Sequence, residues 1–165
     1  MATAHINIGS NLGDSRSVLE RAVTEIALRW PQGQLRRSSV VESEPWGFAG
    51  SRRFLNIGVE IQVEETPLQL LRALQEIERG ICAAPHRDAA GGYIDRVVDI
   101  DLIYYDDVVM DTPELQLPHP RMHLRPFVLT PLRELAPGWR HPSGLSEVPE
   151  AQGEMERKGV IEGRD

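Results

Sequence analysis

Cysteine, lysine and long apolar runs are scarce in this chain of 165 residues. The single cysteine, Cys82, cannot form an internal disulfide, which favours a reducing, cytoplasmic compartment. No apolar run approaches the ~20 residues that span a membrane, and the N-terminus lacks a charged-then-apolar signal peptide. These absences predict a cytoplasmic protein with no membrane partner, long enough for one domain with a hydrophobic core.

Lysine occurs once, at Lys158, and the other 17 basic residues are arginines. Because no lysine precedes residue 158, the folded body has none to offer a P-loop. A phosphate would have to be bound by arginine, by backbone N–H groups or by a metal ion. A GC-rich genome would produce the same bias, so both explanations stay open. The net charge of −7 argues against a nucleic-acid partner.

The segment from Arg96 to Tyr105 carries the strongest chemical signal. β-branched and aromatic residues dominate it, which predicts a buried strand, and side-chain alternation then puts Asp99 and Asp101 on one face. Two carboxylates about 6 Å apart repel by roughly 3 kcal/mol at an effective dielectric constant of about 20. A divalent cation would relieve this repulsion, and magnesium is typically held by one or two carboxylates. The alternative is the solvent-facing side of an edge strand, which tolerates aspartate.

The segment Phe54–Val63 alternates most clearly. Its apolar face consists of Leu55, Ile57, Val59, Ile61 and Val63. On the other face, Phe54 and Asn56 are two residues apart and suit stacking and hydrogen bonding to a flat heterocycle. Solvent-facing strand sides often mix such residues, so this signal is weak by itself.

Two helices and two further strands are expected before the strand that carries the aspartates. Ala4–Ile8 predicts a first strand, and Ser17 and Glu20 have the spacing of a capping box for a helix that ends at Pro31. A second, weaker strand is expected over Leu35–Ser43. Thr66-Pro67 with Gln69 predicts the start of the second helix, packed by leucine and isoleucine up to residue 81.

The order strand, helix, strand, strand, helix, strand predicts an α+β fold with a ferredoxin-like βαββαβ core. Its antiparallel sheet would carry helices on one face and leave the other face free for ligands. A C-terminal hairpin over residues 108–117 and a helix from Phe127 would follow. We expect a domain over residues 1–146 and a polar, flexible tail over 147–165.

Several short motifs occur together. They are Gly-Ser-Asn-Leu-Gly-Asp (9–14), Glu-Pro-Trp-Gly (44–47), Phe-Leu-Asn (54–56), Ile-Glu (77–78), Arg-Val-Val-Asp-Ile-Asp-Leu (96–102), Pro-His-Pro-Arg (118–121) and Arg-Pro-Phe-Val-Leu-x-Pro-Leu (125–132). In this order they resemble the 6-hydroxymethyl-7,8-dihydropterin pyrophosphokinases of folate biosynthesis, over roughly residues 4–142.

The resemblance implies a monomeric transferase that moves diphosphate from ATP to the pterin hydroxymethyl group and releases AMP. It implies two magnesium ions at Asp99 and Asp101, with Arg96 and Arg87 as further catalytic residues. It implies a pterin site of Ser43, Trp46, Phe54, Asn56, Tyr93 and Phe127. It implies ATP contacts, or support of the ATP site, from Gln75, Glu78, Leu102, His119 and Arg125.

The loop before the aspartate pair departs from the family pattern. Relatives often carry Gly-Arg-x-Arg and Arg-Trp-Gly-Pro-Arg there, whereas this chain has Arg87 and Tyr93 and lacks one arginine. A catalytically silent pterin- or nucleotide-binding module on the same fold is therefore the main alternative. RNA binding through the sheet face is disfavoured by the negative charge and by the two aspartates.

Overall fold

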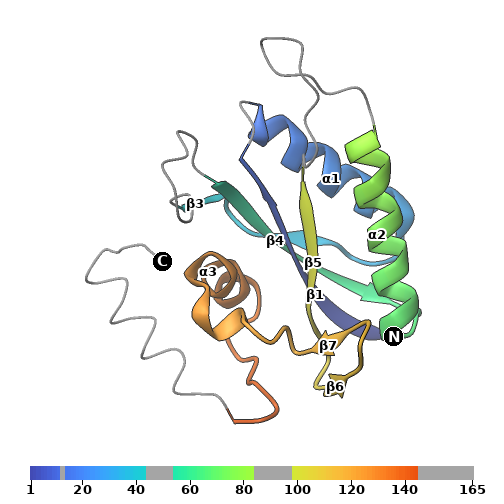
Figure 1. Ribbon diagram of the computed structural model, residues 1–165, viewed down its shortest axis with the longest axis vertical. Coiled ribbons are helices and arrows are strands. Elements are labelled where there is room, and N and C mark those ends of the chain that lie inside the picture. Colours follow the sequence, from blue (N-terminus) through green and yellow to red (C-terminus); the bar gives the residue numbers. More distant parts are fainter. Residues whose placement is uncertain (12–13, 44–53, 84–97, 145–165) are drawn as a thin grey trace.

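The computed structural model describes residues 1–11, 14–43, 54–83 and 98–144. A five-stranded sheet lies at its centre, in the order β2-β4-β1-β5, with β3 also paired to β4 (Figure 1). The strands of this sheet are β1 (Ala2–Ser10), β2 (Arg36–Arg37), β3 (Val41–Ser43), β4 (Phe54–Val63) and β5 (Asp99–Tyr105). All its pairings are antiparallel, which confirms the predicted α+β architecture.

Two helices cover one face of the sheet, α1 (Ser15–Arg29) and α2 (Pro67–Ala83) (Figure 1). The main core lies between them and the sheet. It takes every second side chain of the strands, for example Ile6 and Ile8 of β1 and Ile100 of β5, all of them buried. The alternation of each strand thus sends polar residues such as Asn7 to the opposite face.

The two helix starts differ from one another. At α2 the predicted capping box is confirmed, because Thr66 N donates to Gln69 Oε1 at 2.9 Å and Gln69 N donates to Thr66 Oγ1 at 3.3 Å. At α1 the predicted box is wrong: the helix starts at Ser15, after Asp14, with no side-chain capping bond. Glu20 instead forms an ion pair with Arg37 of β2, with 2.6 Å between oxygen and nitrogen.

The predicted strand over Leu35–Ser43 is two short strands, β2 and β3, joined through Ser38. Ser38 N donates to Gly58 O at 2.9 Å, while Gly58 N donates to the Ser38 side-chain oxygen, Oγ, at 2.8 Å. A hydroxyl therefore replaces a backbone carbonyl in the ladder, and regular pairing is interrupted at this residue.

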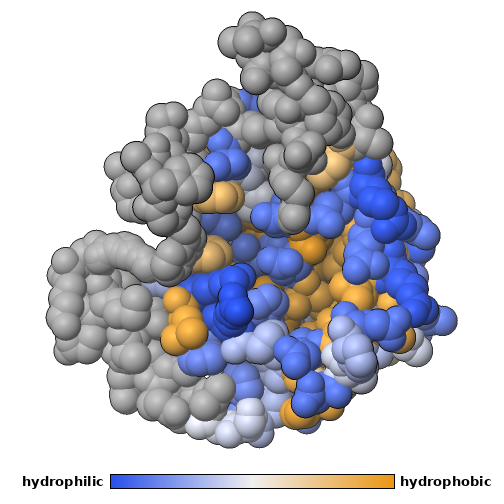
Figure 2. All heavy atoms as spheres, in the orientation of Figure 1, coloured by the Kyte–Doolittle hydropathy of each residue, from blue (hydrophilic) through white to orange (hydrophobic). Residues whose placement is uncertain are grey.

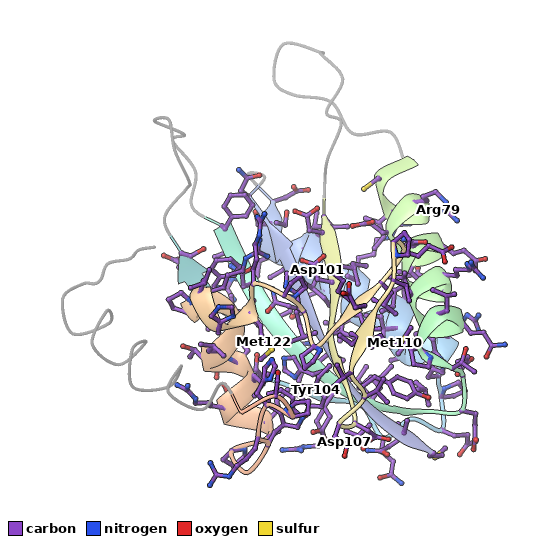
Figure 3. All side chains as sticks on the ribbon, turned by 60° about the horizontal axis from the view of Figure 1, so that its bottom comes forward. Arg79, Asp101, Tyr104, Asp107, Met110 and Met122 are labelled. Atoms are coloured by element: carbon purple, nitrogen blue, oxygen red, sulfur yellow. The ribbon has the colours of Figure 1, made fainter. Side chains whose placement is uncertain are left out.

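A third helix, α3 (Pro126–Leu135), lies on the opposite face of the sheet (Figure 1). The register of β5 against β1 shifts between His5 and Ile6, and the extra residue is Ile103. This bulge lets Ile103 and Tyr104 both join the second apolar cluster with α3. Figure 3 labels Tyr104 and Met122, two members of that cluster. The ligand-accessible face is therefore smaller than the sequence alone suggests.

Residues 108–117 form the predicted hairpin, with β6 (Met110–Asp111) paired to β7 (Gln116–Leu117). A 3-10 turn, η1 (Met122–Leu124), connects it to α3. No helix within the described ranges is both long and apolar enough to cross a membrane. The predicted tail over 147–165 lies outside the described residues.

A row of aromatic rings begins at His5 in the sheet. The His5 ring is fully buried and stacks on Tyr104 with 5.7 Å between ring centroids, and Tyr104 stacks on Trp139 at 4.4 Å. Neither His5 nitrogen has a hydrogen-bond partner among the described residues. Burial lowers the pKa of His5 to about 3 and raises that of Tyr104 to about 12.

Gly58 of β4 lies where α3 comes closest to the sheet. A Cβ on Gly58 would lie 2.7 Å from Pro131 Cβ and 2.9 Å from His5 Cε1, whereas a Cβ on Gly80 of α2 would meet nothing within 4 Å. We expect Gly58→Ala to lower the free energy of unfolding by about 1–3 kcal/mol through overpacking. Gly80→Ala, the matched control, should raise it by about 0.5 kcal/mol. Urea unfolding would measure both, and equal effects would contradict the packing described here.

His5 should make stability depend on pH. Its pKa is depressed in the folded protein, so below its ordinary value of 6.5 the unfolded chain takes up a proton that the folded chain does not. The free energy of unfolding should therefore fall by roughly 1–2 kcal/mol between about pH 7.5 and about pH 5 on account of His5 alone. In His5→Gln the fall should be smaller by that amount, because the two proteins share every other ionisable group. Parallel pH profiles would show that His5 is not neutral when buried.

Candidate functional site

Two pockets adjoin strand β5: the first lies on the face of the sheet that α1 and α2 leave uncovered, and the second lies beside β5, between α2 and the β6–β7 hairpin. The first has a volume of about 550 Å³. It is lined by Asn7, Gly9, Ser43, Phe54, Asn56, Asp99, Asp101, Arg121, Leu124, Arg125 and Phe127. The second has a volume of about 510 Å³. It is lined by Leu71, Gln75, Glu78, Asp99, Ile100, Asp101, Leu102, Thr112, Pro113, Glu114, Leu115, Gln116, His119 and Pro120.

Asp99 and Asp101 line both pockets and therefore mark the boundary between them. Both are half-buried residues of β5, and they lie opposite Gly9 and Asn7 of β1 in the register. Strand β5 is at the edge of the sheet, as the alternative of a solvent-facing edge strand required. However, its aspartate face forms the walls of pockets and not a flat solvated surface. Figure 3 labels Asp101 on this face of β5.

The backbone between the two aspartates is held from α2. Glu78 Oε2 accepts a hydrogen bond from Ile100 N at 3.0 Å, on the edge of β5 that no other strand within the described residues covers. An edge N–H that is satisfied in this way is fixed in position and cannot pair with another chain. Glu78 thus lines the second pocket and also positions the aspartate pair.

The donor set around Asp99 and Asp101 fits magnesium. No group of three or more His, Cys, Asp or Glu side chains that could hold a metal ion occurs in the parts of the chain that the structure describes. A closed zinc site needs four protein ligands, whereas magnesium binds one or two carboxylates and keeps its other positions for water and phosphate oxygens. Two carboxylates between two open pockets meet that requirement.

The first pocket combines aromatic rings with a chain of hydrogen-bonded side chains. Asn7 Nδ2 donates to Asn56 Oδ1 at 3.3 Å, and Asn56 Nδ2 donates to Ser43 Oγ at 3.2 Å. Phe54 and Phe127 line the same pocket from β4 and α3. Figure 2 shows hydrophilic residues gathered over the middle of this face, between α3 and α2, with apolar residues beside them. A flat, polar-edged ligand fits such walls.

Asn7 and Asn56 are the most buried of these three hydrogen-bonded side chains, each with an exposed fraction of 3%. Its Oδ1 is buried and has no hydrogen-bond partner among the described residues. An unsatisfied buried acceptor costs about 1–3 kcal/mol. Such a group in a pocket wall is typical of a binding site, because a purely structural amide is normally satisfied on both sides.

The second pocket contains His119 as its titratable ring. His119 Nδ1 accepts the Arg121 backbone N–H at 3.1 Å, and His119 N donates to Ile103 O at 2.7 Å, which ties this segment to β5. Burial, assisted by Arg125 and Arg121, lowers the pKa of His119 to about 4. The ring is therefore neutral near pH 7, with its proton on Nε2, because Nδ1 acts as an acceptor.

The predicted residues fall into the two pockets largely as the sequence grouped them. Ser43, Phe54, Asn56 and Phe127 line the first pocket. Gln75, Glu78, Leu102 and His119 line the second. Arg125 was grouped with the second set but lines the first pocket, with its guanidinium carbon 5.8 Å from the Phe127 ring centroid. Trp46, Arg87, Tyr93 and Arg96 lie outside the described residues.

Sequence reasoning missed four residues that line the first pocket. They are Asn7, Gly9, Arg121 and Leu124. A signal for the first two was present, because a strand that alternates around Ile6 and Ile8 must send Asn7 and Gly9 to the face that carries the aspartates. Arg121 and Leu124 lie in the segment between β7 and α3, and this segment has no periodic pattern from which their positions could be predicted.

One known protein family matches the part of the chain that contains both pockets. The family model of 7,8-dihydro-6-hydroxymethylpterin-pyrophosphokinase (HPPK) matches residues 5–137. The chain belongs to this family. The predicted enzyme family is thereby confirmed, and the match spans both pockets.

Relatives and solved structures agree with the family. The 2-amino-4-hydroxy-6-hydroxymethyldihydropteridine pyrophosphokinase of Porphyromonas gingivalis is 39% identical over 143 residues, covering 86% of this chain and 95% of the relative. That of Bacillus subtilis is 35% identical over 132 residues, covering 80% and 77%. The crystal structure of Plasmodium falciparum HPPK-DHPS with pteroate matches with a TM-score of 0.66 at 13% identity, over 96% of this chain and 43% of that longer chain. This last likeness supports the fold alone.

Loss of one carboxylate should separate metal binding from stability. We expect Asp99→Asn and Asp101→Asn each to weaken magnesium binding at least about tenfold, because each removes one of two charged ligands. The melting temperature should stay within a few degrees, since removing one charge also relieves repulsion in the metal-free protein. Calorimetric titration with magnesium and an ATP analogue, beside thermal unfolding, would measure both quantities.

Asp107→Asn is the matched control, because Asp107 is exposed, follows β5 and lies outside both pockets (Figure 3). It should leave magnesium binding unchanged. A collapse of the melting temperature in the Asp99 or Asp101 variants would identify these carboxylates as structural.

Proposed function

We propose that this chain transfers diphosphate from ATP to the hydroxymethyl group of 6-hydroxymethyl-7,8-dihydropterin, in folate biosynthesis. The family match and the names of the relatives support the reaction class. The observation that carries the proposal is that Asp99 and Asp101 line both pockets. A heterocycle in the first pocket and a nucleotide in the second would meet at these two carboxylates.

The chemistry asks mainly for positioning and for neutralisation of charge. The hydroxymethyl oxygen forms a bond to the β-phosphorus of ATP and loses its proton. The bond between the β-phosphorus and the oxygen that bridges to the α-phosphorus breaks, and AMP leaves with that oxygen. Magnesium, as two ions held by Asp99 and Asp101, would supply the positive charge that the phosphates require.

The first pocket would bind the pterin. Phe54 and Phe127 offer ring faces for stacking, and Asn56 offers both a donor and an acceptor to the lactam edge of the ring. Ser43 holds the Asn56 amide through its hydroxyl. In this arrangement the heterocycle is bound by stacking and by directional hydrogen bonds, and its hydroxymethyl group points toward the aspartates.

The second pocket would bind ATP. Neutral His119 would donate its Nε2–H to a phosphate oxygen, because its other nitrogen is occupied and its low pKa keeps the ring uncharged. Gln75 and Glu78 of α2 and Leu102 of β5 would surround the nucleoside. Arg125, between the aromatic wall and η1, carries the positive charge that suits the phosphates.

The residues outside the described ranges complete the proposal. Trp46 is proposed to line the pterin site through its backbone, Tyr93 to cover the pterin, and Arg87 and Arg96 to bind phosphate oxygens. We further propose a monomer that works in the cytoplasm. These parts rest on the sequence resemblance.

Separation of the nucleotide products tests the reaction directly. The protein should form AMP in step with loss of the pterin when ATP, magnesium and 6-hydroxymethyl-7,8-dihydropterin are mixed. Asp101→Asn should reduce this rate by orders of magnitude, and Asp107→Asn should not. ADP as the product would point to an ordinary kinase. Tight pterin binding without any nucleotide product would favour the silent binding module.

A further inference from the structure

The Asn56 amide is held from three sides, two of which belong to β1. Asn56 Nδ2 donates to Ser43 Oγ at 3.2 Å, and Asn56 Oδ1 accepts from Asn7 Nδ2 at 3.3 Å. On the third side, a Cβ at position 9 would lie 2.8 Å from Asn56 Oδ1, so only a glycine lets the amide oxygen come this close to β1. All four residues line the first pocket.

These contacts distinguish the two ends of an otherwise symmetric group. The oxygen and the NH₂ of an amide have nearly the same shape but opposite hydrogen-bonding character. Ser43 cannot select between them, since a hydroxyl can both donate and accept. Asn7 disfavours rotation of Asn56 alone, which would bring the two NH₂ groups together, and Gly9 disfavours rotation of both amides, which would bring the Asn56 NH₂ against its Cα hydrogens. The hydrogens of Gly9 also favour an oxygen at that point.

The unpaired oxygen of Asn7 is the second observation. Asn7 Oδ1 is buried and lacks a hydrogen-bond partner within the described part of the chain. Asn7 has an exposed fraction of 3% and lies between Gly58 of β4 and Asp101 of β5 in the register. Leaving this acceptor unpaired costs free energy, so the packing of the sheet alone does not account for an asparagine at this position.

We propose that Asn7 is a specificity-determining, positioning residue of the heterocycle pocket. It fixes the orientation of the Asn56 amide and thereby decides which heterocycle edge the pocket accepts. This inference rests on the proposed function, in which Asn56 binds the lactam edge of the pterin. A lactam edge presents a carbonyl acceptor next to an N–H donor. In the corresponding 4-amino heterocycle an amino donor stands next to a bare ring nitrogen, so the pattern is reversed.

A freed Asn56 could rotate and match the reversed pattern. Discrimination between the two heterocycles should therefore depend on Asn7 even though Asn7 need not touch either of them. This expectation separates a positioning role from a structural one, since loss of packing would weaken the binding of both heterocycles alike.

The test compares Asn7→Leu, which keeps the shape of the side chain and removes its polar atoms, with the unmodified chain. The two ligands are 6-hydroxymethyl-7,8-dihydropterin and its 2,4-diamino counterpart, and dissociation constants are measured with magnesium and a non-hydrolysable ATP analogue. We expect the preference for the pterin to fall about tenfold in Asn7→Leu, because a hydrogen bond that orients the Asn56 amide is lost. The loss should fall more on the dissociation constant of the pterin than on the rate at saturating substrates, because the contacts of the transferred phosphates are not altered directly.

Thr3→Val is the matched control. Thr3 Oγ1 donates to Gln62 Oε1 at 3.1 Å, which is the same kind of side-chain bond across the same pair of strands, but outside both pockets. It should leave the preference unchanged. If Asn7→Leu folds poorly, Asn7→Ala serves the same comparison with less bulk.

The outcomes distinguish the role of Asn7 from the proposed function of the chain. An unchanged preference in an Asn7 variant, with an active unmodified enzyme, would overturn the role of Asn7. Equal weakening of both ligands with a lower melting temperature would also overturn it, in favour of a structural role. Failure of the unmodified chain to form AMP from ATP and the pterin would instead refute the proposed function.

Discussion

The pairing of β1 with both β4 and β5 is the constraint on which the site depends. Asn7 lies opposite Gly58 on one side and opposite Asp101 on the other, and Gly9 lies opposite Asn56 and Asp99. Because side chains alternate along each strand, this double register brings the amide chain and the carboxylates onto one face and the aliphatic core onto the other. A slip by one residue would exchange the two faces, and the site would be lost together with the core.

Helix α3 divides the face of the sheet that lies away from α1 and α2 into a part that packs against the helix and an open part. The bulge at Ile103 turns two consecutive residues of β5 toward α3, whereas Asp99 and Asp101 remain on the open part. The same helix supplies Phe127 to the wall of the first pocket. The helix that closes the second apolar cluster therefore also forms part of the wall of the first pocket.

Much of this arrangement could be predicted from residue patterns. Alternation in β4 and β5 predicted the faces of Phe54, Asn56 and the aspartates, and the Thr66 capping box predicted the start of α2. The bulge, the position of α3 and the break at Ser38 could not be predicted, because each depends on contacts between segments that are distant in sequence. Asn7 was missed for a different reason: its strand was recognised, but its partner Asn56 is known only from the register.

Strand β1 also affects how the chain can fold during synthesis. It is the first strand made, yet its pairing with β5 joins Ala4 to Tyr105, and Thr3 N donates to Asp106 Oδ1 across 103 positions of sequence. One edge of β1 must therefore stay unpaired until the ribosome has released most of the domain, which exposes a strand with one apolar face to other nascent chains. Contacts of such long range also slow the closure of the sheet relative to its helices. The central position that unites the two halves of the site makes β1 the segment whose protection by chaperones would matter most before translation ends.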